Sequence, residues 1–318
     1  MPAFAETILV IFTLIAIGYA TAGLRLLKPA TGDGLSDFVF TIAVPLLLFR
    51  TIATASFDHG PPWALWASYF VAVLVTWTAA HLLVRAGFGR DRRSGVVAGV
   101  TAAFSNLVLL GIPFMSGLYG EAGLAVLSQI VSIHLPIMLG ASMILFEWAL
   151  NRDGVSAEPK SLPALATGFL RQLGSNPLII GILCGLVVRL SGFGIPTVAD
   201  RVIASLANVA GPMALFAMGV SLFGYGVRGQ GRQAFALVAL KLVLMPAVAL
   251  AMALMFGLTD FQLKVVVAAA SLPAGVNSWL IANRFGTGQR LASTSMTLGT
   301  ALAAVTTGIW LAIVDAIL

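Results

Sequence analysis

The sequences SGVVAGVTAAFSNLVLLGIPFMSGLYG (residues 94–120) and QLKVVVAAASLPAGVNSWLIANRFG (residues 262–286) decide how this chain folds. Each is apolar enough to cross a membrane, yet each carries asparagine, glycine and proline in its interior. Proline removes a backbone donor and clashes with the preceding helical turn, and glycine loosens that turn. We therefore predict two membrane helices that are broken near their middle. The residues that mark the breaks are Asn106, Gly111 and Pro113 in the first segment and Pro273, Gly275 and Asn277 in the second.

The composition of the whole chain also indicates a membrane protein. Of its 318 residues, 59% are hydrophobic and only 9% are charged, whereas a soluble domain carries roughly 25% charged residues. The mean hydropathy is +1.00. So few charges cannot cover a surface in water, so we expect an all-α polytopic membrane protein whose surroundings are a lipid bilayer. The net charge of +6 gives no basic stripe, which argues against a nucleic-acid partner.

Cysteine and histidine are too scarce and too scattered for a metal centre. The single cysteine, Cys184, excludes an intramolecular disulfide and a multi-cysteine metal site. The three histidines, His59, His81 and His134, do not lie within helical reach of one another. No pairing of a nucleophile with a base is visible either. We expect no metal, no cofactor and no enzymatic activity.

Apolar runs between charged or Pro/Gly-rich stretches predict ten spans. They cover residues 4–24, 35–56, 62–85, 95–118, 122–149, 175–192, 199–225, 233–256, 262–284 and 291–315. The longest polar stretch, NRDGVSAEPKSL (residues 151–162), divides the chain near its midpoint.

The two halves of the chain resemble each other. A shift of 167 residues, the distance from Ile15 to Ile182, aligns two prolines, an aspartate and several apolar residues without gaps. The aligned pairs include Gly18 with Gly185, Pro29 with Pro196, Asp33 with Asp200, Pro45 with Pro212 and Phe49 with Phe216. Since each half has an odd number of predicted spans, the halves enter the membrane in opposite senses. Such inverted repeats are typical of secondary transporters.

The distribution of basic residues predicts the orientation. Thirteen of the 18 Lys and Arg residues lie in the loops after odd-numbered spans, against four on the other side. Cytoplasmic loops carry the excess of Lys and Arg. We therefore expect the odd-numbered loops in the cytoplasm and both termini outside.

The two broken spans predict where a ligand binds. Because they run in opposite directions, their second halves begin near the midplane, and two helix N-termini with partial positive charge converge there. Such a point favours an anion. Asn106, Asn277 and Ser278 add neutral donors.

Gln129 is a further candidate for the substrate site, and Pro45, His134 and Lys241 are secondary candidates. Gln129 and His134, on the fifth span, are either ligand-binding groups or buried hydrogen-bonding groups that hold helices together. Lys241 either extends its stem to the interface or faces a cavity and attracts an anionic substrate. Pro45 bends the second span and lies either in the scaffold or near the substrate.

Four segments carry a family resemblance. They are FVFTIAVPLLLFRTIA (38–53), NLVLLGIPF (106–114), Gln129 with Leu145-Phe146-Glu147, and SLPAGVNSWLIANRFG (271–286). Together they resemble the auxin efflux carrier family, which includes plant auxin carriers and bacterial organic-acid transporters. The resemblance implies two inverted five-helix repeats with crossed, broken fourth and ninth helices, as in bile-acid symporters and NhaA-like antiporters. It also implies an elevator mechanism and a carboxylate bound by Asn106, Gly111, Pro113, Gln129, Pro273 and Gly275.

The family layout divides the chain into a scaffold and a transport domain. The scaffold comprises residues 1–57 and 174–227, the transport domain residues 58–150 and 228–318, and the cytoplasmic linker residues 151–173. The resemblance further implies a homodimer formed through the scaffold.

The function expected from these features is a bacterial inner-membrane transporter, with both termini periplasmic, for small organic anions such as mono- or dicarboxylates and auxin-like aromatic acids. The alternative is a sodium- or proton-coupled organic anion symporter of the bile-acid type. Sodium coupling is disfavoured because no Asp or Glu lies deep in a predicted span, whereas His134 offers a route for protons. A channel would need a continuous polar stripe, which the spans lack.

Overall fold

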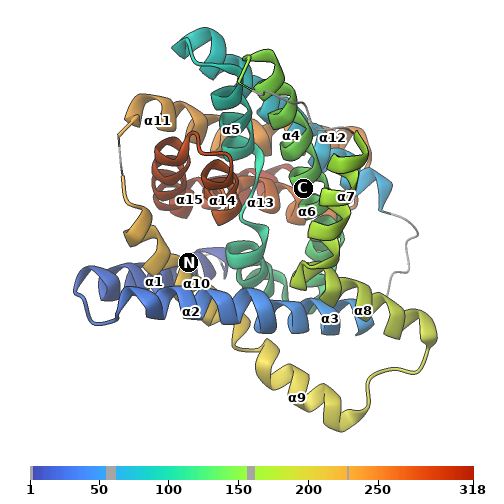
Figure 1. The fold of residues 1–318 in the computed structure, drawn as a ribbon. Coiled ribbons are helices and arrows are strands. Elements are labelled where there is room, and N and C mark those ends of the chain that lie inside the picture. The colour runs from blue at the N-terminus through green and yellow to red at the C-terminus, as the bar shows by residue number, and fades with distance from the viewer. Residues whose placement is uncertain (1–2, 55–61, 156–161, 228) are drawn as a thin grey trace. The chain divides into compact units, whose positions relative to one another are not determined.

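The computed structural model describes residues 3–54, 62–155, 162–227 and 229–318, and the regular structure of this part of the chain is helical (Figure 1). The α-helices are α1 (Ala3–Gly23), α2 (Pro29–Phe38), α3 (Val44–Thr54), α4 (Trp63–Leu82), α5 (Arg92–Ala103), α6 (Ile112–Arg152), α7 (Leu162–Gly174), α8 (Pro177–Ser191), α9 (Thr197–Ala207), α10 (Ala210–Tyr225), α11 (Gly231–Ala239), α12 (Met245–Met255), α13 (Asp260–Ser271), α14 (Val276–Arg284) and α15 (Gln289–Ile317). Four π-helical turns join them: η1 (Val39–Ala43), η2 (Leu83–Gly87), η3 (Leu107–Gly111) and η4 (Leu240–Leu244).

Seven helices of the described chain are long and apolar enough to cross a membrane, and a bent pair, Pro163–Gly174 with Pro177–Ser191, makes up to eight. The expectation of an all-α membrane protein is confirmed. Two predicted spans, 95–118 and 262–284, have no continuous helix. Their helices α5, α13 and α14 have 12, 12 and 9 residues, short of the roughly 20 that a span needs.

Gly120 divides the longest of these apolar stretches, Leu107–Arg152. Its backbone angles, φ 60° and ψ −146°, are not helical and are open to glycine but costly for other residues. The predicted gap between residues 118 and 122 therefore coincides with a real interruption.

Prolines explain three of the π-helical turns. Pro45, Pro113 and Pro246 each occupy the second position of the α-helix that follows η1, η3 and η4. A proline there has no N–H for the carbonyl four residues earlier and pushes against it, which widens the preceding turn. The carbonyl four residues before Pro246 belongs to Leu242, and it accepts a hydrogen bond of 2.8 Å from the indole N–H of Trp310.

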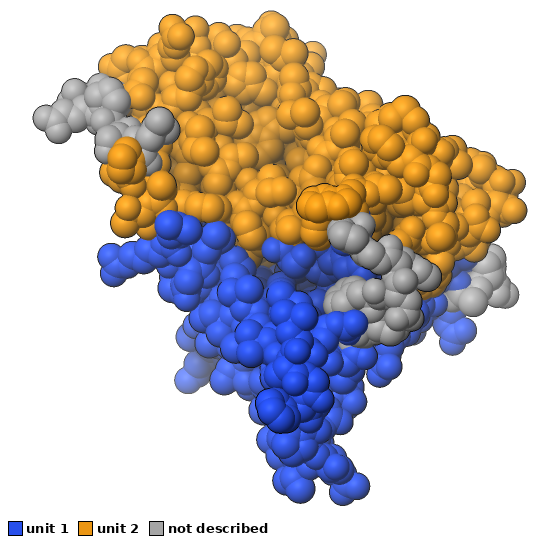
Figure 2. All heavy atoms as spheres, turned by 90° about the vertical axis from the view of Figure 1, so that its right-hand side faces the viewer, with its two compact units in different colours: residues 1–62, 108–132, 170–224 blue, residues 63–107, 133–169, 225–318 orange. Residues whose placement is uncertain are grey.

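The chain forms two compact units, drawn in blue and orange in Figure 2. Unit 1 comprises residues 1–62, 108–132 and 170–224, and in it α3 packs on α8 and α9. Two glycines bring backbones together there. A Cβ added to Gly18 of α1 would collide with the carbonyl of Phe216 in α10, and one added to Gly185 of α8 would lie 2.6 Å from the carbonyl of Phe49 in α3. Small residues are the usual device for such close helix contacts in membranes.

Unit 2 comprises residues 63–107, 133–169 and 225–318. Its two short helices α5 and α13 are enclosed by protein: residues 95–103 and 265–271 are all buried. Helix α5 packs on α4, α14 and α15, and α13 packs on α12 and α15. In Figure 1 the red α14 and α15 are drawn beside the brown α13. Residues 95–103 and 265–271 are apolar on nearly every side, so their sequences favour burial on all sides.

Parts of the predicted domain division lie outside the described residues. These are the boundary between residues 57 and 58 and positions 156–161 of the linker. Residues 162–173 of the linker are helical, because they belong to α7.

Candidate functional site

The second break follows directly from Pro273. A proline restricts the residue before it to extended backbone. Leu272 accordingly adopts φ −65° and ψ 148°, which ends α13 at Ser271. Helix α14 begins three residues after Pro273, with Gly275 as its N-cap. The predicted break at Pro273 and Gly275 is therefore confirmed.

The first break lies earlier than its sequence predicts. Helix α5 ends at Ala103, and Phe104 leaves the helical region with φ −85° and ψ 87°. Gly111 and Pro113 lie beyond the break, in η3 and the first turn of α6. The prediction that these two residues mark the break is wrong, because the helix is interrupted at residues 104–106 and Gly111 and Pro113 accompany only the π-helical turn that follows. Asn106 does lie at the break.

The two breaks pair with each other inside unit 2. Ser105 and Ala274 form an isolated antiparallel β-bridge. The Asn106 N–H donates to the Pro273 carbonyl at 2.9 Å, and the Gly275 N–H donates to the Phe104 carbonyl at 2.9 Å. Backbone groups that leave a helix within a membrane need such partners. The crossing of the breaks, which we define as residues 104–106 with 272–275, thus satisfies both interruptions at once.

Gly275 makes this close pairing feasible. A Cβ added to it would lie 3.2 Å from the Cα of Asn106, closer than ordinary side-chain contacts allow. Ser105, Asn106 and Ala274 are buried.

The first turn of α14 offers polar groups next to the crossing. The Ser278 N–H donates to the Gly275 carbonyl at 3.0 Å, whereas the amides of Val276 and Asn277 precede any acceptor within the helix. The Ser278 hydroxyl, fully buried, donates to the Gly275 carbonyl at 2.7 Å. Asn277 is half-buried on the same turn. An anion is the ligand that such a turn favours.

The remaining candidates fall in both units. Pro45, Gly111, Pro113 and Gln129 belong to unit 1, whereas His134 and Lys241 belong to unit 2. Pro45 is buried in α3, and its backbone contacts Gly181 of α8, so it contributes to the packing of unit 1. Gln129 is half-buried on α6.

Lys241 does not extend its stem to the interface, so that interpretation is wrong. The residue is 2% exposed. Its Nζ lies 2.6 Å from the carbonyl oxygen of Ala270, 2.8 Å from Ser105 Oγ and 3.0 Å from Met245 Sδ. The space beside it, lined by Thr101 and Ala274 among others, is too small for a water molecule. Lys241 is therefore packed under the crossing and not in an open cavity.

His134 packs as an aromatic ring. Its centroid lies 4.8 Å from that of Phe104 and 5.4 Å from that of Tyr69, both edge to face. Neither ring nitrogen has a hydrogen-bond partner among the described residues. The interpretation of His134 as a hydrogen-bonding link between helices is therefore wrong.

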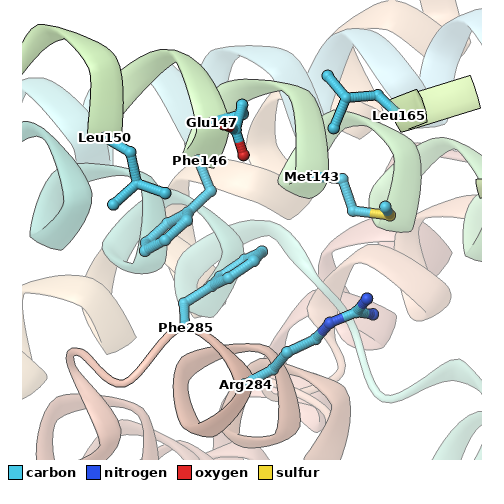
Figure 3. A pocket seen from close by; sticks show the side chains of 7 residues that line it. All are labelled: Met143, Phe146, Glu147, Leu150, Leu165, Arg284 and Phe285. Atoms are coloured by element: carbon cyan, nitrogen blue, oxygen red, sulfur yellow. The ribbon is translucent and has the colours of Figure 1, made fainter. Parts of the chain in front are cut away.

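A pocket that the sequence did not predict lies near the C-terminal end of α6 (Figure 3). It has a volume of about 300 Å³ and is lined by Met143, Phe146, Glu147, Leu150, Leu165, Arg284 and Phe285. The rings of Phe146 and Phe285 stack at 3.7 Å. Both phenylalanines belong to segments that carry the family resemblance, LFE and NRFG, which is the one signal that could have indicated the pocket.

Metal binding receives no support in the described ranges. Within them, no group of three or more His, Cys, Asp or Glu residues could hold a metal ion.

Comparison with known proteins places the chain among transporters. Residues 3–311 match the family described as "Membrane transport protein". A Rhizobium meliloti protein named "Putative malonate transporter" is 28% identical over 94% of this chain and 92% of its own length. The "Auxin efflux carrier component 8" of Arabidopsis thaliana is 26% identical over 93% of each chain. The mouse "Lysosomal cholesterol signaling protein" is 25% identical over 74% of this chain and 28% of its own length.

Proposed function

This chain belongs to the membrane transport protein family, that of the auxin efflux carriers, and we propose that it is a secondary transporter of small organic anions that binds the substrate carboxylate at the crossing. The family consists of membrane transporters, which are generally not enzymes. A small-molecule substrate and a lipid bilayer follow from that membership. The choice of mono- and dicarboxylates draws on relatives named for malonate and auxin.

The pairing of the two breaks is the observation that carries this proposal. Helix α14 starts at Val276, directly after the Ser105–Ala274 bridge. A helix N-terminus carries about half a positive elementary charge. Asn106 and Asn277 lie at or next to the bridge and supply neutral amide donors, and Ser278 lies beside them with its hydroxyl already donating to the Gly275 carbonyl. A carboxylate there would be held without a buried acid–base pair. The roles of Gly111, Pro113 and Gln129 stay predictions from the family resemblance.

The packing of unit 1 supports the inverted repeat of five plus five spans. Gly18 meets the backbone of Phe216, and Gly185 meets the backbone of Phe49. The shift of 167 residues relates Gly18 to Gly185 and Phe49 to Phe216. Exchanging the two halves of the chain therefore turns one contact into the other, as a two-fold relation between the halves requires. The antiparallel bridge between Ser105 and Ala274 fits the same relation.

The proposed mechanism is an elevator, in which residues 58–150 and 228–318 move against the scaffold of residues 1–57 and 174–227. Unit 1 contains most of the scaffold and unit 2 most of the moving part, which supports this division. Residues 108–132 group with unit 1, however, and a moving fourth span would have to separate from it. Dimerisation through the scaffold, the bacterial inner membrane and periplasmic termini are parts of the same proposal.

A thermal-shift screen of the purified protein tests the function. The panel contains malonate, malate, lactate and indole-acetate. Binding raises the free energy of unfolding by about 2.7 kcal/mol when the ligand is at 100 times its Kd. Asn106→Ala and Asn277→Ala should remove most of the shift, whereas Asn283→Ala, at an exposed position on α14, should keep it. Absence of any carboxylate shift, or an equal shift in all variants, would refute the site.

A further inference from the structure

Lys241 forms a set of contacts that the transport proposal does not use. It lies in the π-helical turn η4, and its ammonium is buried under the crossing. The three groups within hydrogen-bond distance are the Ala270 carbonyl, the Ser105 hydroxyl and the Met245 thioether. They come from α13, the first break and α12. One side chain therefore links three segments that are far apart in the sequence.

The three contacts account for all donors of an ammonium group. A protonated lysine has three N–H donors and no acceptor. A carbonyl oxygen and a thioether sulfur can only accept. Ser105 Oγ also lies 3.9 Å from Met245 Sδ, which directs its own hydrogen to the sulfur and leaves its lone pairs for Lys241. With every donor engaged inside the protein, Lys241 has none left for a substrate.

The partial negative charges at the carboxyl ends of α5 and α13 favour a cation at the position of the Lys241 Nζ. Ala270 lies in the last turn of α13, whose carbonyls lack helical donors, and Ser105 follows the end of α5 by two residues. The C-terminal end of a helix carries a partial negative charge. Within the described ranges, no carboxylate forms an ion pair with Lys241. Helix ends and neutral acceptors are therefore what stabilises its charge.

We propose that the Lys241 ammonium is a tethered cation that fills a monovalent-cation site at the carboxyl ends of α5 and α13 and thereby positions the crossing. The same carbonyl, hydroxyl and helix ends could also coordinate a free monovalent cation in place of the Lys241 ammonium. Lys241 is thus a positioning residue, and its charge makes a bound sodium ion unnecessary. The effect on carboxylate binding rests on the proposed function, whereas the effect on the fold does not.

Removing the side chain and adding a small amine tests this site. Lys241→Ala should lower the Tm and weaken carboxylate binding roughly tenfold or more, the scale for losing hydrogen bonds to a charged group. Ammonium or methylammonium should restore both in a saturable way, whereas choline, which is too large, should not. The matched control is Lys264→Ala, because Lys264 is half-exposed and pairs with Asp315 at 2.7 Å. It should show no amine effect.

Lys241→Met keeps the length of the side chain without its charge and covers the case in which Lys241→Ala does not fold. It should bind carboxylate as weakly as the alanine variant and should not respond to amines, because the thioether fills the space. Wild-type stability and binding in Lys241→Met would overturn the proposal, as would equal responses of Lys241→Ala to methylammonium and choline. If the wild type binds no carboxylate, the transport proposal fails, and amine rescue of the Tm still decides the cation site.

Discussion

The two helix breaks reach the same pairing by different means. The second, Leu272–Gly275, contains a proline and a glycine, and Pro273 alone prevents the helix from continuing. The first, Phe104–Asn106, contains neither, and its nearest glycine and proline lie beyond it in η3 and α6. The first break is therefore stabilised by the second break, through the hydrogen bonds of Phe104 and Asn106 with it.

This difference teaches that one break is encoded locally and the other by tertiary contact. A change in the second break should therefore disturb both, whereas a change at Gly111 or Pro113 should leave the first break in place. Three pairs of variants test these contacts, in order of decreasing effect.

The largest effect is expected for Gly275→Val. Its branched side chain would press on the backbone of Asn106, where a Cβ already lies only 3.2 Å from the Cα. Overpacking of this kind costs about 1–3 kcal/mol, so the Tm should fall and carboxylate binding should be lost. Gly34→Val in α2 is the control, because a Cβ there meets no atom within 4 Å. Equal Tm values for the two variants would contradict the tight crossing.

A smaller effect is expected for Pro273→Ala, measured against Pro113→Ala. Without Pro273, Leu272 is free to become helical, and we expect carboxylate affinity to fall about tenfold, equivalent to about 1.4 kcal/mol. Pro113 occupies the first turn of α6, where proline is well tolerated, so Pro113→Ala should change affinity little. Equal losses in a binding titration would show that both prolines belong to the site and that the asymmetry is wrong.

The smallest effects are expected at the N-caps of the helices that lead into the breaks. Asp91 accepts the Ser94 N–H at 2.9 Å at the start of α5, and Thr259 accepts the Gln262 N–H at 3.3 Å at the start of α13. Replacing either by Ala should lower the free energy of unfolding by about 1 kcal/mol.

The two caps should differ in their pH dependence. Burial raises the pKa of Asp91, but hydrogen bonds from Ser94 and Arg93 outweigh it and hold the pKa below its usual value. The Asp91 cap therefore stabilises at neutral pH, and its contribution disappears as the pH falls below about 4. The Tm difference between wild type and Asp91→Ala should shrink over that range, whereas that for Thr259→Ala should not. A pH-independent difference at Asp91 would contradict the assignment.

Much of the fold could be predicted from the sequence because local rules decide it. Apolar runs gave the all-helical membrane architecture, Gly120 marks the predicted gap between two spans, and Pro273 ends α13 where proline must. Helices and helix ends that depend on neighbouring residues in the chain can therefore be predicted from one sequence.

The rest depends on residues distant in the chain. Phe104 and Ser105 carry no helix-breaking signal, and two of the three acceptors of Lys241, Ser105 and Ala270, lie 136 and 29 positions away in the chain. The burial of Lys241 could not be inferred from its place in an apolar run, because a long stem in such a run also reaches the interface. His134 likewise looked like a hydrogen-bonding residue until its aromatic neighbours were known.

Protection of a cysteine by substrate tests the central claim most directly. Cys184 is the single cysteine of the chain, so Cys184→Ser gives a thiol-free background for Val276→Cys, half-buried next to the crossing, and Asn283→Cys at the exposed control position. The rate of labelling by a small thiol reagent is measured with and without saturating malonate, or whichever carboxylate gives the largest thermal shift. Labelling should be slower at position 276 when the carboxylate is bound, and its rate should be unchanged at position 283. An unchanged rate at both positions, with a carboxylate shown to bind, would place the ligand elsewhere.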